Sequence, residues 1–220
     1  MLRGLFVTGT GTGIGKTVTA AALMHRFRSE APLRYWKPVQ TGIEQDDDRE
    51  TVRKLGACRE NEILCKGIRL AGAVSPHLAA EWNGSRIEIA EVTSIIEKEP
   101  RAAWIVEGAG GVLVPLNDSA LMVDLIAALR LPALVVSRSE LGTINHTLLT
   151  LEALRFRNLD IAGVIMAGEQ NRSNREAIEH FGKVTVLGEL PRISELSADK
   201  LAQWAKSELD PSGTLVKMLR

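Results

Sequence analysis

A glycine-rich stretch near the amino terminus holds the residues best suited to do chemistry. It runs from Gly9 to Thr17 with the sequence GTGTGIGKT and follows directly on a short apolar run. In such a loop the backbone N–H groups wrap around phosphates, the lysine reaches the β- and γ-phosphate oxygens, and the threonine hydroxyl can coordinate Mg²⁺. A helix that begins at Thr17 would point the positive end of its dipole at the same anion. The loop therefore predicts a site for a nucleoside triphosphate.

The glycine spacing departs by one residue from the standard phosphate-binding motif. That motif has a glycine five residues before Gly15, where this chain has Thr10, and Gly9 lies one position further back. The loop is either one residue longer than the standard form or a chance resemblance, although a plain turn would leave the Gly-Lys-Thr triplet unexplained. The dinucleotide-binding fingerprint fits less well, because its third glycine would fall on Ile14 or Lys16.

Two more residues are placed to serve a phosphoryl-transfer centre. Lys37 stands at the end of a strand-like run before a proline, where it could supply a second cation, although a lysine usually faces solvent. Glu107 ends an apolar run before a glycine-rich turn, which is also a common place for a structural glutamate. Together with Thr17 and one aspartate from 46–48, Glu107 would provide the hard oxygen ligands that Mg²⁺ prefers.

A third stretch, residues 141–146, leads into a predicted helix. Thr143 has the side chain of an N-cap, and the N–H groups at the start of this helix could receive a carboxylate. Plain helix capping explains Thr143 equally well. The four histidines are scattered and show no metal-ligand spacing.

Short apolar runs alternate with helical patterns along the chain and must position these residues. The predicted strands cover 4–8, 34–39, 103–107, 133–137, 161–166 and 184–188. The predicted helices cover 17–28, 87–97, 122–129, 143–157 and 174–181. Ser173 and Glu176 would form a capping box for the last helix. This alternation predicts an α/β fold, a doubly wound and mainly parallel sheet with helices on both faces. Ligands of such sheets bind beyond the carboxyl ends of the strands, where Lys37 and Glu107 fall.

Composition narrows the class of protein. The length of 220 residues predicts a single domain, and 27 basic residues balance 27 acidic ones. Such a balance favours neither nucleic acid nor an anionic membrane as a partner. Cys58 and Cys65 lack zinc-type spacing and indicate no disulfide framework. With no leader and no apolar run near the roughly 18 residues of a membrane span, we expect a cytoplasmic protein.

Five segments, in order, resemble the dethiobiotin synthetase family over most of the chain. They are the loop at 9–17, KPVQTG at 37–42, Ser-Pro-His at 75–77, VEGAGG at 106–111 and GTINH at 142–146. The longer phosphate loop is typical of that family. The resemblance implies one P-loop domain over 1–220 that uses ATP and Mg²⁺ to close a ring. In that reaction 7,8-diaminopelargonate and CO₂ (from bicarbonate) form a carbamate, ATP converts it to a carbamic-phosphoric anhydride, and dethiobiotin, ADP and phosphate result.

The resemblance also implies roles for individual residues. Lys16 and Lys37 would be the catalytic cations, and Thr17, Asp48 and Glu107 would hold the metal. Asp48 is preferred among the three aspartates because the helical stretch after it aligns best. The nucleotide-binding residues would be Gly13, Ile14, Gly15, Lys16, Thr17, Val18, Asp48, Glu107, Gly108, Ala109, Gly110, Pro191, Arg192 and Ile193. The substrate-binding residues would be Thr12, Thr41, Gly142, Thr143, Ile144 and Asn145.

Quaternary structure and base recognition are implied in the same way. The family forms a homodimer in which the substrate carboxylate meets a helix start of the partner subunit, corresponding here to 142–145. Many relatives carry an Asn-Asp pair where this chain has Ala167 and Gly168. This departure predicts a weaker preference for adenine, so other nucleoside triphosphates would also serve.

Two other functions use similar loops. Partitioning-type ATPases usually carry an extra lysine early in the loop, where this chain has Gly11. A nucleotide-dependent switch would use the γ-phosphate only to order its loops and would not need the KPVQT segment that begins at Lys37. Both alternatives therefore explain fewer of the residues singled out above than a dethiobiotin synthetase does.

Overall fold

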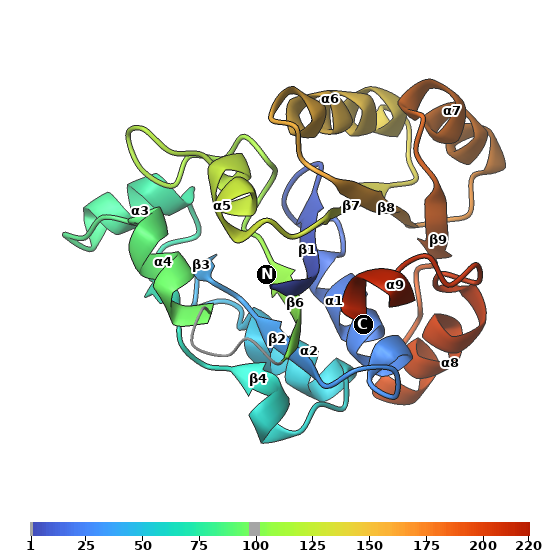
Figure 1. Ribbon diagram of the computed structural model, residues 1–220, viewed down its shortest axis with the longest axis horizontal. Helices are drawn as coiled ribbons and strands as arrows, with labels where there is room; N and C mark the ends of the chain where they lie inside the picture. The colour runs from blue at the N-terminus through green and yellow to red at the C-terminus, as the bar shows by residue number, and fades with distance from the viewer. Residues whose placement is uncertain (1, 97–101) are drawn as a thin grey trace.

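A seven-stranded parallel sheet organises the molecule. The computed structural model describes residues 2–96 and 102–220 (Figure 1). The strands in spatial order are β4 (Ile63–Leu64), β2 (Leu33–Trp36), β6 (Ala103–Glu107), β1 (Arg3–Gly9), β7 (Ala133–Arg138), β8 (Ile161–Ala167) and β9 (Val186–Leu190). Neighbouring strands pair in parallel throughout this sheet. This arrangement confirms the predicted doubly wound α/β class.

Helices cover both faces of the sheet. One layer contains α1 (Lys16–Phe27), α2 (Asp48–Leu55), α8 (Ala198–Glu208) and α9 (Val216–Leu219). The other layer contains α4 (Ile89–Ile96), α5 (Met122–Leu129), α6 (Thr143–Phe156) and α7 (Arg172–Gly182). Figure 1 shows α6 and α7 on the opposite side of β7 and β8 from α1 and α8.

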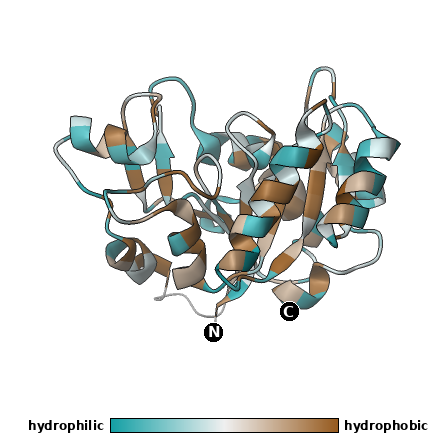
Figure 2. Ribbon diagram, turned by 90° about the horizontal axis from the view of Figure 1, so that it is seen from above, coloured by the Kyte–Doolittle hydropathy of each residue, from teal (hydrophilic) through white to brown (hydrophobic). Residues whose placement is uncertain are grey.

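The apolar strands explain this layering. Leu5 and Val7 of β1 are fully buried in one core cluster, whereas Phe6 between them is buried in the other. Because successive side chains point to opposite faces, a strand that is apolar at every position needs a helix layer on each side. Figure 2 shows the hydrophobic strands enclosed between amphipathic helices.

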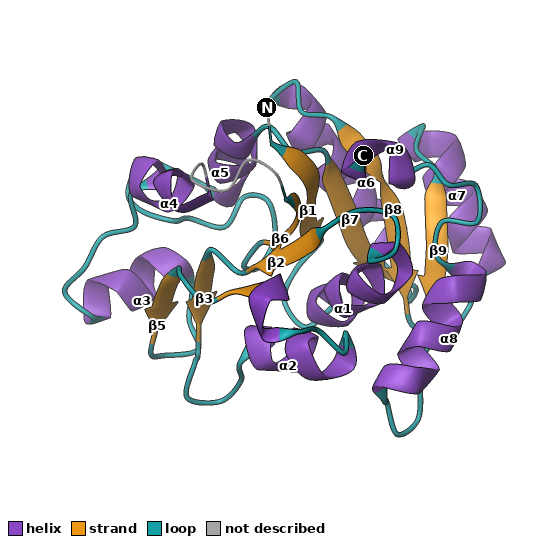
Figure 3. Cartoon of the chain, turned by 60° about the horizontal axis from the view of Figure 1, so that its bottom comes forward, coloured by secondary structure: helices purple, strands orange, loops and turns teal. Residues whose placement is uncertain are grey.

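A small second sheet lies beside the main one. It pairs β3 (Val39–Thr41) in parallel with β5 (Ile68–Leu70), and α3 (Pro76–Trp82) packs on it (Figure 3). The strand predicted over 34–39 is therefore two strands. Pro38 has no N–H with which to continue a ladder, and the break leaves Lys37 between the two sheets.

Three local predictions are wrong in detail. The strand predicted over 184–188 runs from Val186 to Leu190. The side chain of Asn171, not Ser173, accepts the hydrogen bond that caps α7, from the backbone N of Asn174 at 3.0 Å. The helix predicted over 87–97 begins at Ile89, and its predicted last residue lies outside the described residues.

Several elements carry no sequence prediction. They are α3, α8 and α9, the strands β4 and β5, and a 3-10 turn at Glu60–Glu62, whereas α2 is the helical stretch expected after Asp48. No helix in residues 2–96 and 102–220 combines the length and the apolar character needed to cross a membrane.

Candidate functional site

The phosphate loop leaves the central strand β1 and enters α1. Gly15 caps the helix in a left-handed conformation with φ of 96°, and Gly13 has φ of 67°, so both positions favour glycine. Lys16 is only 7% exposed, and its Nζ donates to the carbonyl oxygen of Gly11 at 2.6 Å. Burial, together with the nearby Lys37 ammonium, lowers the pKa of Lys16 to about 8. The loop thus presents backbone N–H groups and a desolvated lysine to one space.

A second glycine-rich turn lies against the phosphate loop. It follows β6 and includes Gly108, Ala109 and Gly110, which were predicted to bind nucleotide. A Cβ added to Gly108 would lie 2.8 Å from the ring of Phe6, and one added to Gly111 would lie 3.3 Å from the carbonyl oxygen of Gly9. A side chain at residue 108 would thus collide with Phe6 of β1, and one at residue 111 would push the phosphate loop away by a few tenths of an ångström.

Four of the predicted chemical residues converge beneath these loops. The hydroxyl of Thr17 is 2.9 Å from Asp48 Oδ1 and 2.9 Å from Glu107 Oε1. Lys37 Nζ is 2.6 Å from Asp48 Oδ2 and 2.8 Å from Glu107 Oε1, and it donates to the Gly108 carbonyl at 3.1 Å. The group comes from α1, α2, the end of β6 and the link between the two sheets, so only the folded chain assembles it.

The charge of Lys37 is stabilised by its neighbours. Lys37 is 5% exposed and Glu107 is fully buried, which rules out the usual solvent-facing role of a lysine. Burial alone would lower the pKa of Lys37, but the charges of Glu107 and Asp48 outweigh it and raise that pKa. Lys37 is therefore a buried, charged ammonium between two carboxylates.

The oxygen atoms around Thr17 fit a magnesium ion. Two carboxylates and a hydroxyl supply hard donors, and Mg²⁺ usually completes its shell with phosphate and water. Asp48 is the aspartate of the acidic run that reaches this centre. Asp47 instead caps α2 and pairs with Arg69 at 3.0 Å, while the backbone carbonyl of Asp46 accepts from Gln40. In the described ranges no group of three or more His, Cys, Asp or Glu side chains could hold a metal, so any ion here depends on the mixed set.

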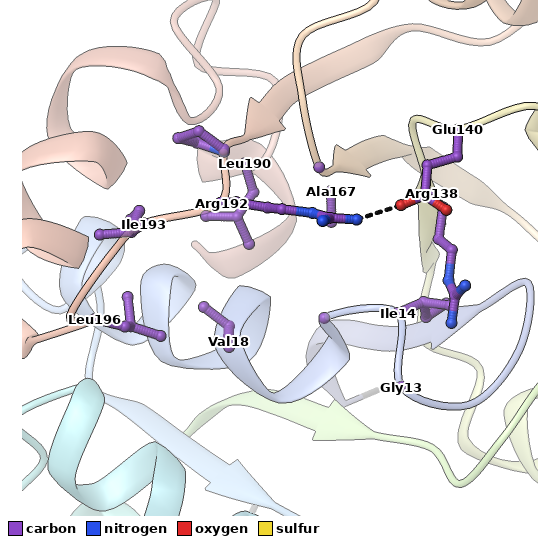
Figure 4. Close-up of a pocket in the computed structure, with 13 residues that line it drawn as sticks. Gly13, Ile14, Val18, Arg138, Glu140, Ala167, Leu190, Arg192, Ile193 and Leu196 are labelled. Carbon is purple, nitrogen blue, oxygen red and sulfur yellow. Dashed lines mark hydrogen bonds and ion pairs between the residues drawn. The ribbon is translucent and has the colours of Figure 1, made fainter.

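A cavity of about 460 Å³ lies on the far side of the phosphate loop (Figure 4). Its walls include predicted nucleotide-binding residues, namely Gly13, Ile14, Gly15, Val18, Pro191, Arg192 and Ile193. Ala167 and Gly168 line it at the end of β8, and Arg192 forms an ion pair with Glu140 across it. Figure 4 shows this pair joining the chain segment after β9 to the one after β7.

Sequence reasoning missed Arg138 and Glu140 as lining residues of this cavity. Arg138 ends β7 and Glu140 lies two residues beyond it, so the rule that ligands bind past the carboxyl ends of strands could have found both.

Two of the predicted substrate residues share a cavity. Thr12 and Thr143 line a space of about 220 Å³ between the phosphate loop and the start of α6, together with Arg138 and His146. Thr41 ends β3 in the small sheet and does not line this cavity.

The start of α6 differs from its prediction. Gly142, with φ of 90°, is the N-cap, and the hydroxyl of the buried Thr143 donates to the carbonyl of Arg138 instead of capping the helix. Glycine adopts this left-handed conformation without strain, so the cap moves one residue earlier. Ile144 is half-buried, whereas Asn145 is exposed at the open end of the helix.

Comparison with known proteins identifies the family. A family model described as an AAA domain matches residues 3–200. The ATP-dependent dethiobiotin synthetase BioD of Paramagnetospirillum magneticum is 45% identical over 201 residues, covering 91% of this chain and 94% of that protein. Its counterpart in Brucella ovis is 46% identical over 197 residues, or 90% of each chain. This chain belongs to the dethiobiotin synthetase family.

Solved structures of other proteins share the fold of this dethiobiotin synthetase-family chain. A ParA family ATPase from Chlorobium tepidum superimposes with a TM-score of 0.58 at 13% identity, covering 99% of this chain and 96% of that one. The MinC:MinD cell division complex from Aquifex aeolicus gives 0.56 at 15% identity, with coverage of 93% and 86%. At these identities the likeness concerns the P-loop fold alone.

One buried residue of this dethiobiotin synthetase-family site has no role assigned from the sequence. The hydroxyl of Tyr35 donates to Glu107 Oε2 at 2.8 Å. Burial, followed by the charge of Glu107, raises the pKa of Tyr35 well above its usual value, so the phenol keeps its proton. The sequence could have indicated this role, because Tyr35 stands two residues before Lys37 and residues two apart lie on one face of an extended chain.

Proposed function

We propose that this chain catalyses ATP-dependent ring closure of 7,8-diaminopelargonate with CO₂ to give dethiobiotin, ADP and phosphate. Its family establishes it as an ATP-dependent ligase of the biotin pathway. The observation that carries the proposal is the buried centre in which Lys37 and Thr17 both meet Asp48 and Glu107 beside the phosphate loop. A protein that only binds a nucleotide has no evident need for a second buried cation there.

The reaction has three steps. One amine of the substrate attacks CO₂ and loses a proton, which gives a carbamate anion. A carbamate oxygen attacks the γ-phosphorus and ADP leaves, which gives a carbamic-phosphoric anhydride. The second amine then attacks the carbonyl carbon, loses a proton and expels phosphate, which closes the ring.

The central difficulty is to bring a carbamate anion against a triphosphate. Lys16 and Lys37 would offset that repulsion, because phosphoryl transfer depends mainly on positioning and electrostatic stabilisation. Thr17, Asp48 and Glu107 would hold Mg²⁺, which neutralises charge on the phosphate oxygens when bound. The buried position of Lys37 keeps its charge poorly screened by water, so it acts strongly on a nearby anion.

The remaining predicted residues would bind the ends of the substrates. Thr12 and Thr41 would hydrogen-bond the carbamate region. The helix start at 142–145 would receive the substrate carboxylate, supplied by one subunit of a homodimer to the site of the other. The exposed position of Asn145 at the open end of α6 supports this assignment.

The nucleotide base would occupy the 460 Å³ cavity. Pro191, Arg192 and Ile193 would contact it, mostly through their backbone. Ala167 and Gly168 carry no polar side-chain group with which to select adenine, which supports use of several nucleoside triphosphates. A cytoplasmic location remains a prediction from the sequence.

Isotopic labelling tests the proposed route. The protein is supplied with diaminopelargonate, ATP, Mg²⁺ and bicarbonate labelled with ¹³C and ¹⁸O, and products are analysed by mass spectrometry within the first turnover. We expect ¹³C in the product ring and ¹⁸O in the released phosphate, since the bridging carbamate oxygen leaves with phosphorus. Labelled dethiobiotin with unlabelled phosphate would exclude the anhydride, and absence of dethiobiotin would exclude the function.

A further inference from the structure

A single tyrosine is buried against the central carboxylate of the site. Tyr35 is the only tyrosine in the chain and is fully buried. Its hydroxyl donates at 2.8 Å to Glu107 Oε2, whereas Glu107 Oε1 accepts from Thr17 and Lys37 at 2.9 and 2.8 Å. The two oxygens of Glu107 therefore have different partners, Tyr35 on one oxygen and both Thr17 and Lys37 on the other.

The sheet explains why Tyr35 reaches this carboxylate. β2 and β6 are parallel neighbours, and Tyr35 lies opposite Ile105 in their register. Both residues belong to the core cluster on the α1 side, whereas Trp36 and Val106 belong to the cluster on the other side. Glu107 is two residues beyond Ile105, so it points to the same face as Tyr35 and toward α1.

We infer that Tyr35 is a positioning residue, which fixes the rotation of the Glu107 carboxylate so that one oxygen stays beside Thr17 and Lys37, where Mg²⁺ would bind. A fully buried carboxylate that loses a donor turns toward its remaining partners or draws in water, because an unpartnered buried oxygen is costly. Groups that hydrogen-bond a metal ligand from behind commonly change metal affinity 10- to 100-fold when removed. The inference rests on the proposed function, since it concerns the metal of that same site.

The neighbouring residue supplies a matched control. Trp36 is also fully buried, and its indole Nε1 donates to the carbonyl of Lys66 at 2.7 Å. Trp36→Phe and Tyr35→Phe each remove one hydrogen-bond donor from a buried aromatic residue of β2. The two side chains face opposite sides of the sheet, so only Tyr35→Phe alters the surroundings of Glu107.

The test measures metal binding without turnover. Mn²⁺ is titrated by electron paramagnetic resonance into protein saturated with a non-hydrolysable ATP analogue. We expect the Mn²⁺ dissociation constant to rise about tenfold in Tyr35→Phe and to stay within about twofold in Trp36→Phe, with analogue binding in the absence of metal unchanged in both. Wild-type Mn²⁺ affinity in Tyr35→Phe, or an equal loss in Trp36→Phe, would overturn the inference.

A double variant tests whether Tyr35 acts through Glu107. On a Glu107→Ala background, Tyr35→Phe should change the Mn²⁺ dissociation constant by less than about twofold, because Tyr35 then has no acceptor at residue 107. A further loss as large as the one in the wild-type background would show that Tyr35 acts by another route, and would overturn the proposal.

A third measurement does not depend on a substitution. Biosynthetic 3-fluorotyrosine gives one ¹⁹F resonance, because the chain has one tyrosine. Saturating Mn²⁺ with the ATP analogue should broaden that resonance strongly, and a sharp signal would place the metal away from Tyr35. Failure of the proposed function would be seen separately, as a wild-type rate of phosphate release that does not change when the diamine is added. The metal-binding measurements would still decide the role of Tyr35 in that case.

Discussion

Lys37 shows how the site depends on charge balance at single residues. A buried ammonium is costly by itself, and here two carboxylates within 2.8 Å offset that cost and keep it protonated. The same carboxylates fit a metal, so bound Mg²⁺ would share them with Lys37. This arrangement gives the site one fixed cation, with Lys16 held 2.6 Å from a carbonyl of its own loop.

Replacement of Lys37 tests its catalytic role. Lys37→Ala should lower kcat for ring closure by about 100-fold or more, because a fixed charge that stabilises the transition state is lost. Nucleotide affinity should change little, since the phosphate loop is intact. The variant should also lose roughly 3–5 kcal/mol of stability, because two buried carboxylates lose their cation. Turnover is measured by dethiobiotin formation and stability by urea unfolding.

Controls separate these effects. Lys54 is an exposed lysine of α2 with 69% of its side chain accessible, and Lys54→Ala should leave both turnover and stability near the wild-type values. Near-wild-type kcat in Lys37→Ala would remove Lys37 from the chemistry.

At the scale of elements, α2 delivers Asp48 to the site. The helix packs on the core through the buried Val52 and the partly buried Leu55, both of which lie past its first turn. Its start is fixed instead by Asp47, whose side chain accepts from the backbone N of Arg49 at 3.0 Å and pairs with Arg69 of β5. Asp47 thus positions Asp48, while its own side chain bonds Arg49 and Arg69.

Loss of this cap should be measurable. Asp47→Ala should lower the free energy of unfolding by about 1 kcal/mol and raise the Mg²⁺ concentration needed for half-maximal turnover, because α2 frays at Asp48. Asp47→Asn keeps an acceptor and should retain most of the stability. Asp46→Ala serves as the control, since that side chain has no role in the cap. An unchanged Mg²⁺ requirement in Asp47→Ala would contradict this account of α2.

A comparison of the helices and strands with their predictions shows which features the sequence determines locally. The strand Ala103–Glu107 and the helix Met122–Leu129 match their predictions because their apolar patterns are strong. The helix α2 has few apolar residues, and three consecutive aspartates at its start leave open which one caps it; the pairing of Asp47 with Arg69 joins residues distant in the chain. Tyr35 was missed for the same reason, since its partner Glu107 is 72 residues away. The glycine cap of α6 depends on a backbone angle that composition does not determine.

At the scale of the whole molecule, the site lies at the carboxyl ends of the strands, where the start of α6 adjoins the phosphate loop. Leu141 is fully exposed, and Leu149 is 55% and Phe156 84% exposed along the same helix. A solvent-facing row of large apolar residues is unfavourable in an isolated chain. The proposed homodimer would cover part of this surface and would bring a second helix start to each site.

The quaternary prediction is tested in solution. Light scattering after gel filtration should give about twice the chain mass of 24.0 kDa. Leu149→Asp should shift the protein toward the monomer and raise the KM for the diamine, because the partner's helix start is lost. Gln203→Asp places the same charge on an exposed residue of α8, in the other helix layer, and should leave both values unchanged. A monomeric wild type with full activity would rule out the shared site.

The most direct test of the account is whether phosphate release depends on the organic substrate. Purified protein with Mg²⁺ and ATP is assayed alone, with diaminopelargonate, with bicarbonate, and with both. We predict fast phosphate release only when both are present, matched by an equal amount of dethiobiotin and abolished in Lys37→Ala. Phosphate release at one rate in all four mixtures would contradict the proposed ligase activity and favour a simple ATPase.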